Sequence, residues 1–339
     1  MSDDTAGCPD DGQISPDTAI TLSNPGELIA ATPYALGFYP THSIVTLFFE
    51  DAQLRHAIRV DRATDPFLHR RVVSHLVHSA HDLQATSVAV VIVGPPADDG
   101  ALACVRDAFT TAGLPLDLFG TPDIAAGARW FDYDNPARRG NLPDPTTSIV
   151  AVHAVASGLA TLPSREALAA QVAPAPDDVL TRRAALLEVH RANSRSVDVE
   201  EVGDGWVDWV KRRFLDRVAD GDEAFSDEDI VQACDALTRR YVRDACLSLL
   251  TGPHAQAAER LWLLLTRHCP APACAEPACL LAFGAYSRGD SALASVAVDR
   301  ALAADPEHNL ARLLRASLDH GMPPQRIRDL IVDSVEWIL

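Results

Sequence analysis

The chain has 339 residues, of which 47% are apolar and 22% charged, so it has the composition of a folded globular protein and is long enough for two domains. Acidic residues outnumber basic ones by 47 to 29, and a formal net charge of −18 disfavours generic nucleic-acid binding, because it would repel phosphates. No apolar run is long enough to cross a membrane, and the first residues lack a secretory apolar core. Seven irregularly spaced cysteines favour reduced thiols over a disulfide framework, so we expect a cytoplasmic protein without membrane association.

The first 18 residues are acidic and are expected to form a disordered tail, followed by a short strand at 19–23. A helix is then predicted from Asn24, which can cap it, with Glu27 placed to complete a capping box. Pro33 should kink or end this helix, because proline removes one backbone donor. Gly37 is the natural left-handed terminator.

Two strands at 43–50 and 54–61 are separated by a short polar turn, which predicts an antiparallel hairpin. An amphipathic helix over 65–83 leads to the apolar strand 86–94. Because this strand is apolar at every position, Val88 to Val93 should be fully buried at the centre of a sheet covered on both faces.

A helix over 100–113 and strands at 114–120 and 128–134 complete the predicted sheet. The hairpin is antiparallel and the later strands follow helical crossovers, so the sheet should be mixed. The fold class expected for residues 19–175 is therefore α/β.

From Thr147 onward the apolar spacing is helical, and the proline-rich segment 172–178 is the best candidate linker. We place a domain boundary near residue 175 and expect residues 176–339 to form an all-α domain. Near its end, helices at 277–287 and 291–304 resemble one tetratricopeptide-type hairpin, with the turn glycine, two small packing residues and closing proline in place (Gly289, Ala294, Ala301 and Pro306). A single hairpin that closes the core is the alternative to a repeat array.

Four stretches together resemble a known family: "NPGELIAATPYALGFYPTHSIVTLFF" from residue 24, "LPSREALAAQVAP" (162–174), "RYVRDA" (240–245) and "LLAFGAYSRGDSALASVAVDRALAADPEHNLARLL" (280–314). The chain is similar over nearly its whole length to the actinobacterial family known only as domain of unknown function 4192. The resemblance implies an actinobacterial, cytoplasmic protein and supplies no activity. Many relatives have a cysteine-rich insert after the aromatic strand. In this chain the corresponding residues, 135–147, contain no cysteine.

The segment after the apolar strand is one candidate ligand site. Asp98 and Asp99 lie between that strand and a helix, where open α/β sheets often bind ligands, and could hold a divalent ion. They could equally cap the helix and complement its dipole. Thr41, His42 and Ser43 are polar at the entrance of an apolar strand; they could line a pocket, or could cap the turn.

A second candidate is Asp244, predicted at the edge of an apolar helical stripe with Arg240 four residues earlier as its partner. A structural ion pair and an acid with a shifted pKa in a cleft are the two interpretations. Ser164, which follows a proline, is expected to be a helix N-cap rather than a nucleophile.

Two groups of residues have spacings that zinc ligands could have. The first is His75, His78 and His81 on the polar face of the helix over 65–83. Two histidines three residues apart could bind zinc, but no third ligand is evident in the sequence, and the nearby Arg71 would oppose a cation. The second comprises cysteines at the outer limit of zinc spacing (Cys269, Cys274 and Cys279). We expect neither group to hold a metal, and we predict no cofactor.

The sequence has no P-loop, dinucleotide-binding fingerprint, H-E-x-x-H or nucleophile-elbow motif. The favoured function is therefore non-catalytic, with a regulatory or scaffold role through a protein partner or self-association. The alternative is an enzyme with a carboxylate-lined, divalent-metal site between the two domains, built from His42, Asp98, Asp99 or Asp244. A DNA-linked regulator is a third possibility that the net charge disfavours.

Overall fold

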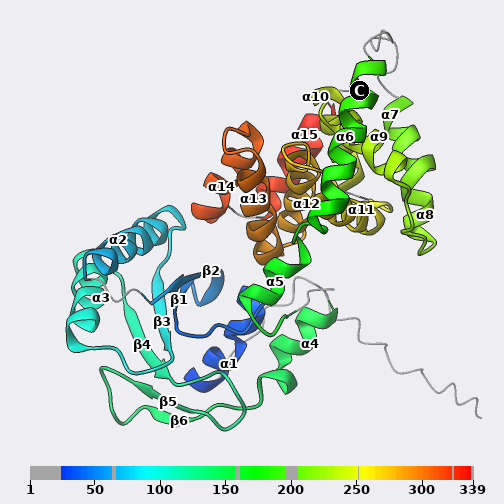
Figure 1. Ribbon diagram of the computed structural model, residues 1–339. Helices are drawn as coiled ribbons and strands as arrows, with labels where there is room; N and C mark the ends of the chain where they lie inside the picture. The colour runs from blue at the N-terminus through cyan, green and yellow to red at the C-terminus, as the bar shows by residue number, and fades with distance from the viewer. Residues whose placement is uncertain are drawn as a thin grey trace, which may run out of the picture.

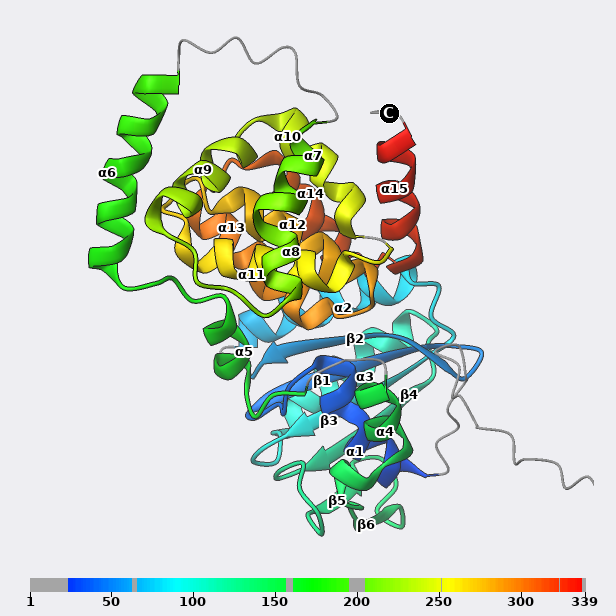
Figure 2. The same cartoon turned by 90° about the vertical axis from the view of Figure 1, so that its right-hand side faces the viewer.

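A computed structural model describes residues 24–62, 66–156, 161–194, 205–250, 252–322 and 324–336. The expected tail at 1–18 and strand at 19–23 lie outside these residues. The described chain forms a sheet half and a helical half that lie side by side, as both views show (Figures 1 and 2). This arrangement agrees with the predicted α/β region followed by an all-α region.

The sheet half contains six described strands in the order β2-β1-β3-β4-β5-β6. Their bounds are β1 (Ser43–Glu50), β2 (Gln53–Asp61), β3 (Ser87–Val93), β4 (Leu116–Thr121), β5 (Arg129–Asp132) and β6 (Arg139–Asn141). Only β3 and β4 pair in parallel, and the other neighbours are antiparallel, so the sheet is mixed as predicted. Strand β6 is not predicted from the sequence, because its residues Arg-Gly-Asn have low strand propensity and pair only at the sheet edge.

The central position of β3 is confirmed, since Val88 to Val93 are all buried between two layers. Val88, Val90 and Ile92 pack with α2 (Pro66–Asp82) and α3 (Asp99–Thr111). Ala89, Val91 and Val93 face the opposite layer, which includes α1 (Pro25–Leu36). Successive side chains of a strand point to opposite faces, so a continuously apolar strand buries both.

Helix α1 begins as predicted and ends later than Pro33 alone would suggest. The Asn24 side chain accepts a hydrogen bond from the Glu27 backbone N–H at 3.1 Å. Glu27 completes the cap differently from the expected box, because its carboxylate accepts from the Asn24 side-chain amide at 3.2 Å. The helix continues through Pro33 to the buried Leu36 and stops at Gly37, whose φ is +73°.

The remaining helices connect the sheet to the helical half and build that half. The connecting elements are η1 (Pro145–Thr147), α4 (Ile149–Ala156) and α5 (Arg165–Gln171). The helical half contains α6 (Asp177–Ser194), α7 (Gly205–Val210), the π-helical η2 (Lys211–Leu215), α8 (Asp216–Ala219), α9 (Asp227–Leu237), α10 (Arg240–Cys246), η3 (Leu247–Leu250), α11 (Ala255–His268), α12 (Ala275–Ser287), α13 (Ser291–Ala304), α14 (Asn309–Asp319) and α15 (Pro324–Glu336). No described helix has the length and apolarity that crossing a membrane requires.

The predicted C-terminal hairpin is confirmed as α12 and α13. Its turn contains Gly289 with φ of +93°, a conformation that favours glycine. Ala294 and Ala301 are fully buried, so small side chains let the two helices approach closely.

The linker segment is packed against the helical half. Ala175 is buried, and its N–H donates to the Arg267 carbonyl at 2.8 Å. One buried apolar cluster also continues from the sheet into helices α9 to α14. Separate folding of the two halves on either side of residue 175 stays a prediction.

The expectation of reduced thiols is wrong for one pair of cysteines. Cys234 on α9 and Cys269 after α11 form a disulfide, with their Cα atoms 6.0 Å apart. Packing of α9 against α11 brings together residues separated by 35 positions, a relationship that cysteine spacing in the sequence does not reveal.

Candidate functional site

A cleft of about 270 Å³ lies where the two halves meet. From the sheet half it is lined by the end of α1, by β2 and by α2, and from the helical half by the start of α13 and the end of α14. Its polar lining residues are His56, Arg59, His75, Ser291, Ser295, Arg315 and Asp319. The cleft is not predicted from the sequence, because its lining residues come from five separate segments of the chain.

The two arginines of the cleft already have partners. Arg59 donates through Nε to Ser43 Oγ at 2.7 Å and pairs with Asp61 at 2.6 Å. Arg315 pairs with Asp319 at 2.9 Å and donates to Ser295 Oγ at 3.0 Å. The positive charges of both arginines are therefore neutralised by neighbouring carboxylates. The cleft offers a ligand hydrogen-bonding groups rather than a net charge.

His56 adds a neutral ring to this lining. Burial lowers its pKa from 6.5 to about 4, because the imidazolium form loses hydration there. The ring is therefore uncharged near neutral pH, when it can donate one hydrogen bond and accept another. A cleft with this lining suits a small polar group or ordered water.

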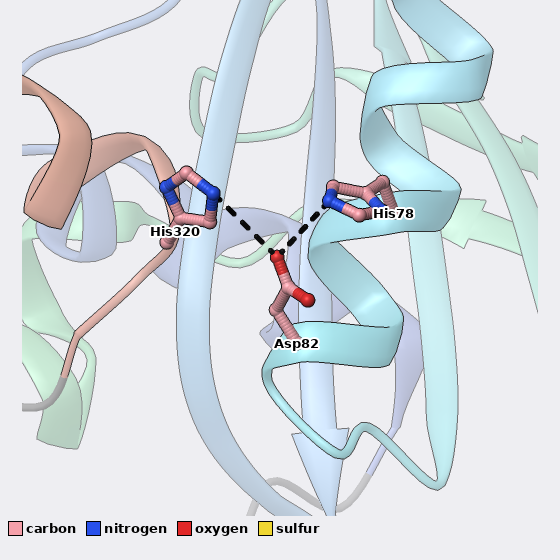
Figure 3. A group of neighbouring side chains, drawn as sticks. All are labelled: His78, Asp82 and His320. Carbon is pink, nitrogen blue, oxygen red and sulfur yellow. Dashed lines mark ion pairs between the residues drawn. The ribbon is translucent and has the colours of Figure 1, made fainter.

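A group of three potential metal ligands lies at the same junction (Figure 3). His78 Nε2 is 3.5 Å from Asp82 Oδ2, and His320 Nε2 is 4.0 Å from the same oxygen. One donor atom of each residue lies within 4.8 Å of those of the other two. The three residues are therefore close enough to hold a metal ion together. The sequence does not reveal His320 as a further ligand beside His78, because nothing local to α2 indicates that the two residues are close in space.

The structure supports the turn-capping interpretation of the "Thr-His-Ser" segment. Ser43 is buried, and its hydroxyl donates to the Thr41 carbonyl at 2.7 Å while accepting from Arg59. His42 is exposed and has φ of +47°, and its carbonyl accepts from the Arg62 N–H at 3.2 Å. A ligand role for His42 or Ser43 stays a prediction.

Asp98 and Asp99 lie at the exposed start of α3. The Asp98 carboxylate accepts from the Ala101 N–H at 2.9 Å, so it is the N-cap. Asp99 occupies the first turn, where a carboxylate is favoured by the helix dipole. Both positions are thus explained by helix stability, and divalent-ion binding by them stays a prediction.

Asp244 is half-buried, as expected, but its main partner is a different arginine. Arg243 donates to Asp244 Oδ1 at 2.6 and 2.8 Å, whereas Arg240 Nε is 4.0 Å from the carboxylate. Arg243 also donates to Glu276 at 3.2 Å and so joins α10 to α12. Because α10 lies far from the sheet in both views, Asp244 is not gathered with His42, Asp98 and Asp99 (Figures 1 and 2).

Glu276, the other carboxylate bound by Arg243, belongs to a buried row of polar groups. His308 lies 3.2 Å from Glu276 through Nε2, and His308 Nδ1 accepts from the Ala311 N–H at 3.2 Å and lies 3.5 Å from Cys279 Sγ. Cys279, His308 and Glu276 thus lie in the order of a nucleophilic thiol, its base and an acid. However, Cys279 is fully buried, and burial raises the pKa of its thiol. The row caps α14 and satisfies buried groups, and the thiol is unsuited to attack.

The other residues weighed in the sequence have structural roles. Ser164 accepts from the Ala167 N–H at 3.2 Å and is the N-cap of α5, as predicted. Of the three cysteines considered for zinc, Cys269 is in the disulfide, and Cys274 and Cys279 are buried free thiols.

Among the described residues, α4 carries three exposed large apolar side chains, more than any other helix. Ile149, Val152 and Val155 recur every three residues along one face of this helix and are 52–74% exposed. The opposite face carries the buried Ala151 and Ala154. Single exposed apolar residues are common, whereas three along one helical face form a small exposed apolar patch.

The chain matches no curated protein and no solved structure. The family described as domain of unknown function (DUF4192) matches residues 25–325. This range includes both halves, the cleft and the three junction residues His78, Asp82 and His320. The chain therefore belongs to the DUF4192 family.

Proposed function

We propose that the protein acts by binding a protein partner, in a regulatory or scaffold role, and that the exposed face of α4 is its contact surface. The observation that carries this proposal is the row Ile149, Val152 and Val155 on one helical face. Burial of a largely exposed valine or isoleucine side chain contributes roughly 1.5–3 kcal/mol, so three such residues provide a useful apolar centre. The surrounding polar surface would form the rim of the interface.

The net charge of −18 favours a basic partner. Oppositely charged proteins associate faster, whereas a second copy of this chain would carry the same negative charge. We therefore expect a heterologous partner that has an apolar patch with basic residues around it. An actinobacterial, cytoplasmic setting for this interaction is part of the same proposal.

The test uses the tagged full-length chain in lysate of its source organism, with captured proteins identified by mass spectrometry. A Val152→Ser/Val155→Ser variant should lose a basic partner that the wild type captures, and added salt should weaken the capture. Val189→Ser is the matched control, because Val189 is 59% exposed on α6. The proposal fails if the α4 variant keeps the partner, or if the wild type forms a dimer that this variant dissociates.

A further inference from the structure

We propose that His78, Asp82 and His320 bind a zinc-class divalent transition-metal ion across the junction of the two halves (Figure 3). Two imidazoles and one carboxylate are a ligand set that suits Zn²⁺ or Co²⁺, whereas Mg²⁺ and Ca²⁺ prefer oxygen ligands. The site is separate from the α4 surface and does not depend on the proposed partner.

Local helix geometry places the first two ligands. His78 and Asp82 are four residues apart on α2, so their side chains project from the same face of the helix. Their closest atoms, Nε2 and Oδ2, are 3.5 Å apart. A tetrahedral zinc ion with bonds of about 2.0–2.1 Å places its donors roughly 3.3 Å apart, so this pair is already near the required spacing.

The third ligand is held by the end of α14. His320 is the C-terminal capping residue of this helix, and its Nδ1 lies 2.7 Å from the Ala316 carbonyl. A carbonyl oxygen can only accept, so Nδ1 carries the proton and Nε2 presents its lone pair. Hydrogen bonds of this kind orient metal-binding histidines in known sites.

The remaining adjustment is small. His320 Nε2 is 4.0 Å from Asp82 Oδ2 and within 4.8 Å of the donor atom of His78, so it must move by roughly 0.7–1.5 Å to reach the donor spacing of a tetrahedral ion. All three residues are exposed, which leaves room for this movement and for a water as the fourth ligand.

The electrostatic setting accepts a cation. Asp82 supplies one negative charge, and the chain as a whole carries −18. Arg71, the basic residue that seemed to oppose an ion, lies seven positions before His78, about 10 Å along the helix axis. At physiological salt this distance exceeds the screening length, so its repulsion is weak.

The consequence of binding is mechanical. His78 and Asp82 belong to the sheet half and His320 to the helical half, so one ion would hold the two halves together beside the cleft. An ion that binds only the folded junction stabilises the fold and raises the unfolding temperature.

The experiment measures Zn²⁺ binding to the chelator-treated full-length chain by calorimetry, with Co²⁺ absorption as a second probe. His78→Ala, Asp82→Asn and His320→Ala should each weaken binding about tenfold or more. The wild type should also gain several degrees in unfolding temperature with Zn²⁺, and His320→Ala should not. His81→Ala is the control, because His81 is an exposed histidine on the same helix outside the group.

Three results with Zn²⁺ would overturn the proposal. These are Zn²⁺ binding that none of the three substitutions weakens, an equal loss in His81→Ala, or a loss in His78→Ala that His320→Ala does not share. The last result would place the ion on α2 alone. Equally tight binding of Mg²⁺ would overturn the assignment to a zinc-class ion. Circular dichroism and the unfolding midpoint without metal establish that each variant is folded, and His78→Gln or His320→Gln replaces the alanine variant at the same position if that variant is not folded.

Discussion

Gly321 lies directly against Leu83, and this contact joins the end of α14 to the end of α2. A Cβ added to Gly321 would be 2.6 Å from Leu83 Cδ2, and the backbone at Gly321 has φ of +60°. His320 immediately precedes the glycine, and Asp82 immediately precedes the leucine. The close approach of the backbone at Gly321 therefore sets how near the imidazole comes to the carboxylate.

The substitution Gly321→Ala should destabilise the protein more than Gly113→Ala. Both glycines have positive φ, with +71° at Gly113, so both variants lose roughly 1 kcal/mol from backbone strain. Only at Gly321 does the new methyl group meet another residue, since nothing lies within 4 Å of a Cβ at Gly113. Urea unfolding gives the two free energies, and equal losses would contradict the close packing at Leu83.

The sequence predicted the elements whose signals are local and missed the relationships between distant elements. The burial of Val88 to Val93 followed from a continuously apolar run, and the α12–α13 hairpin followed from Gly289 and two small residues. His320 and Asp82 are brought together by packing of the two halves, which no local pattern encodes. The same reason explains why the Cys234–Cys269 disulfide was not foreseen.

Local backbone structure also explains the candidate site residues that were predicted from the sequence. Asp98 is a helix cap and Ser43 satisfies a turn, as one of the two interpretations expected in each case. Asp244 was assigned the wrong main partner, because Arg243 reaches its carboxylate from the adjacent position while Arg240 points to solvent with its side chain 87% exposed.

His56 should make the folded protein less stable in mild acid. Its pKa is about 4 in the folded state and 6.5 in its ordinary state, so the unfolded chain binds more protons between these values. Stability from this residue is therefore complete above about pH 6.5 and is lost as the pH falls towards 4. The loss is at most about 3 kcal/mol, and access of solvent through the cleft should reduce it.

The measurement compares wild type with His56→Gln by urea unfolding at several pH values. The unfolding free energy of the wild type should fall relative to that of His56→Gln as the pH falls from 7 to 4.5. A difference that stays constant over this range would mean that His56 titrates as it does in the unfolded chain.

The disulfide should stabilise the helical half. Closing a loop of 35 residues restricts the unfolded chain, with a typical contribution of about 2–4 kcal/mol. Reductant should lower the unfolding temperature of the wild type and leave that of Cys234→Ala/Cys269→Ala unchanged. The denatured wild type should show two fewer reactive thiols before reduction than after. The same thiol count before and after reduction would contradict the disulfide.

Ala301→Phe should overpack the contact between α12 and α13. Ala301 is fully buried beside Ala275, Ala278 and Cys279, where the small side chains leave no space for a ring. Inserting a larger side chain into such a contact typically costs roughly 1–3 kcal/mol. Ala303→Phe is the matched control, because Ala303 is exposed on the same helix. Urea unfolding should show a clear loss for Ala301→Phe and almost none for Ala303→Phe. Similar losses in both variants would indicate a general effect of phenylalanine in α13, and would contradict close packing at Ala301.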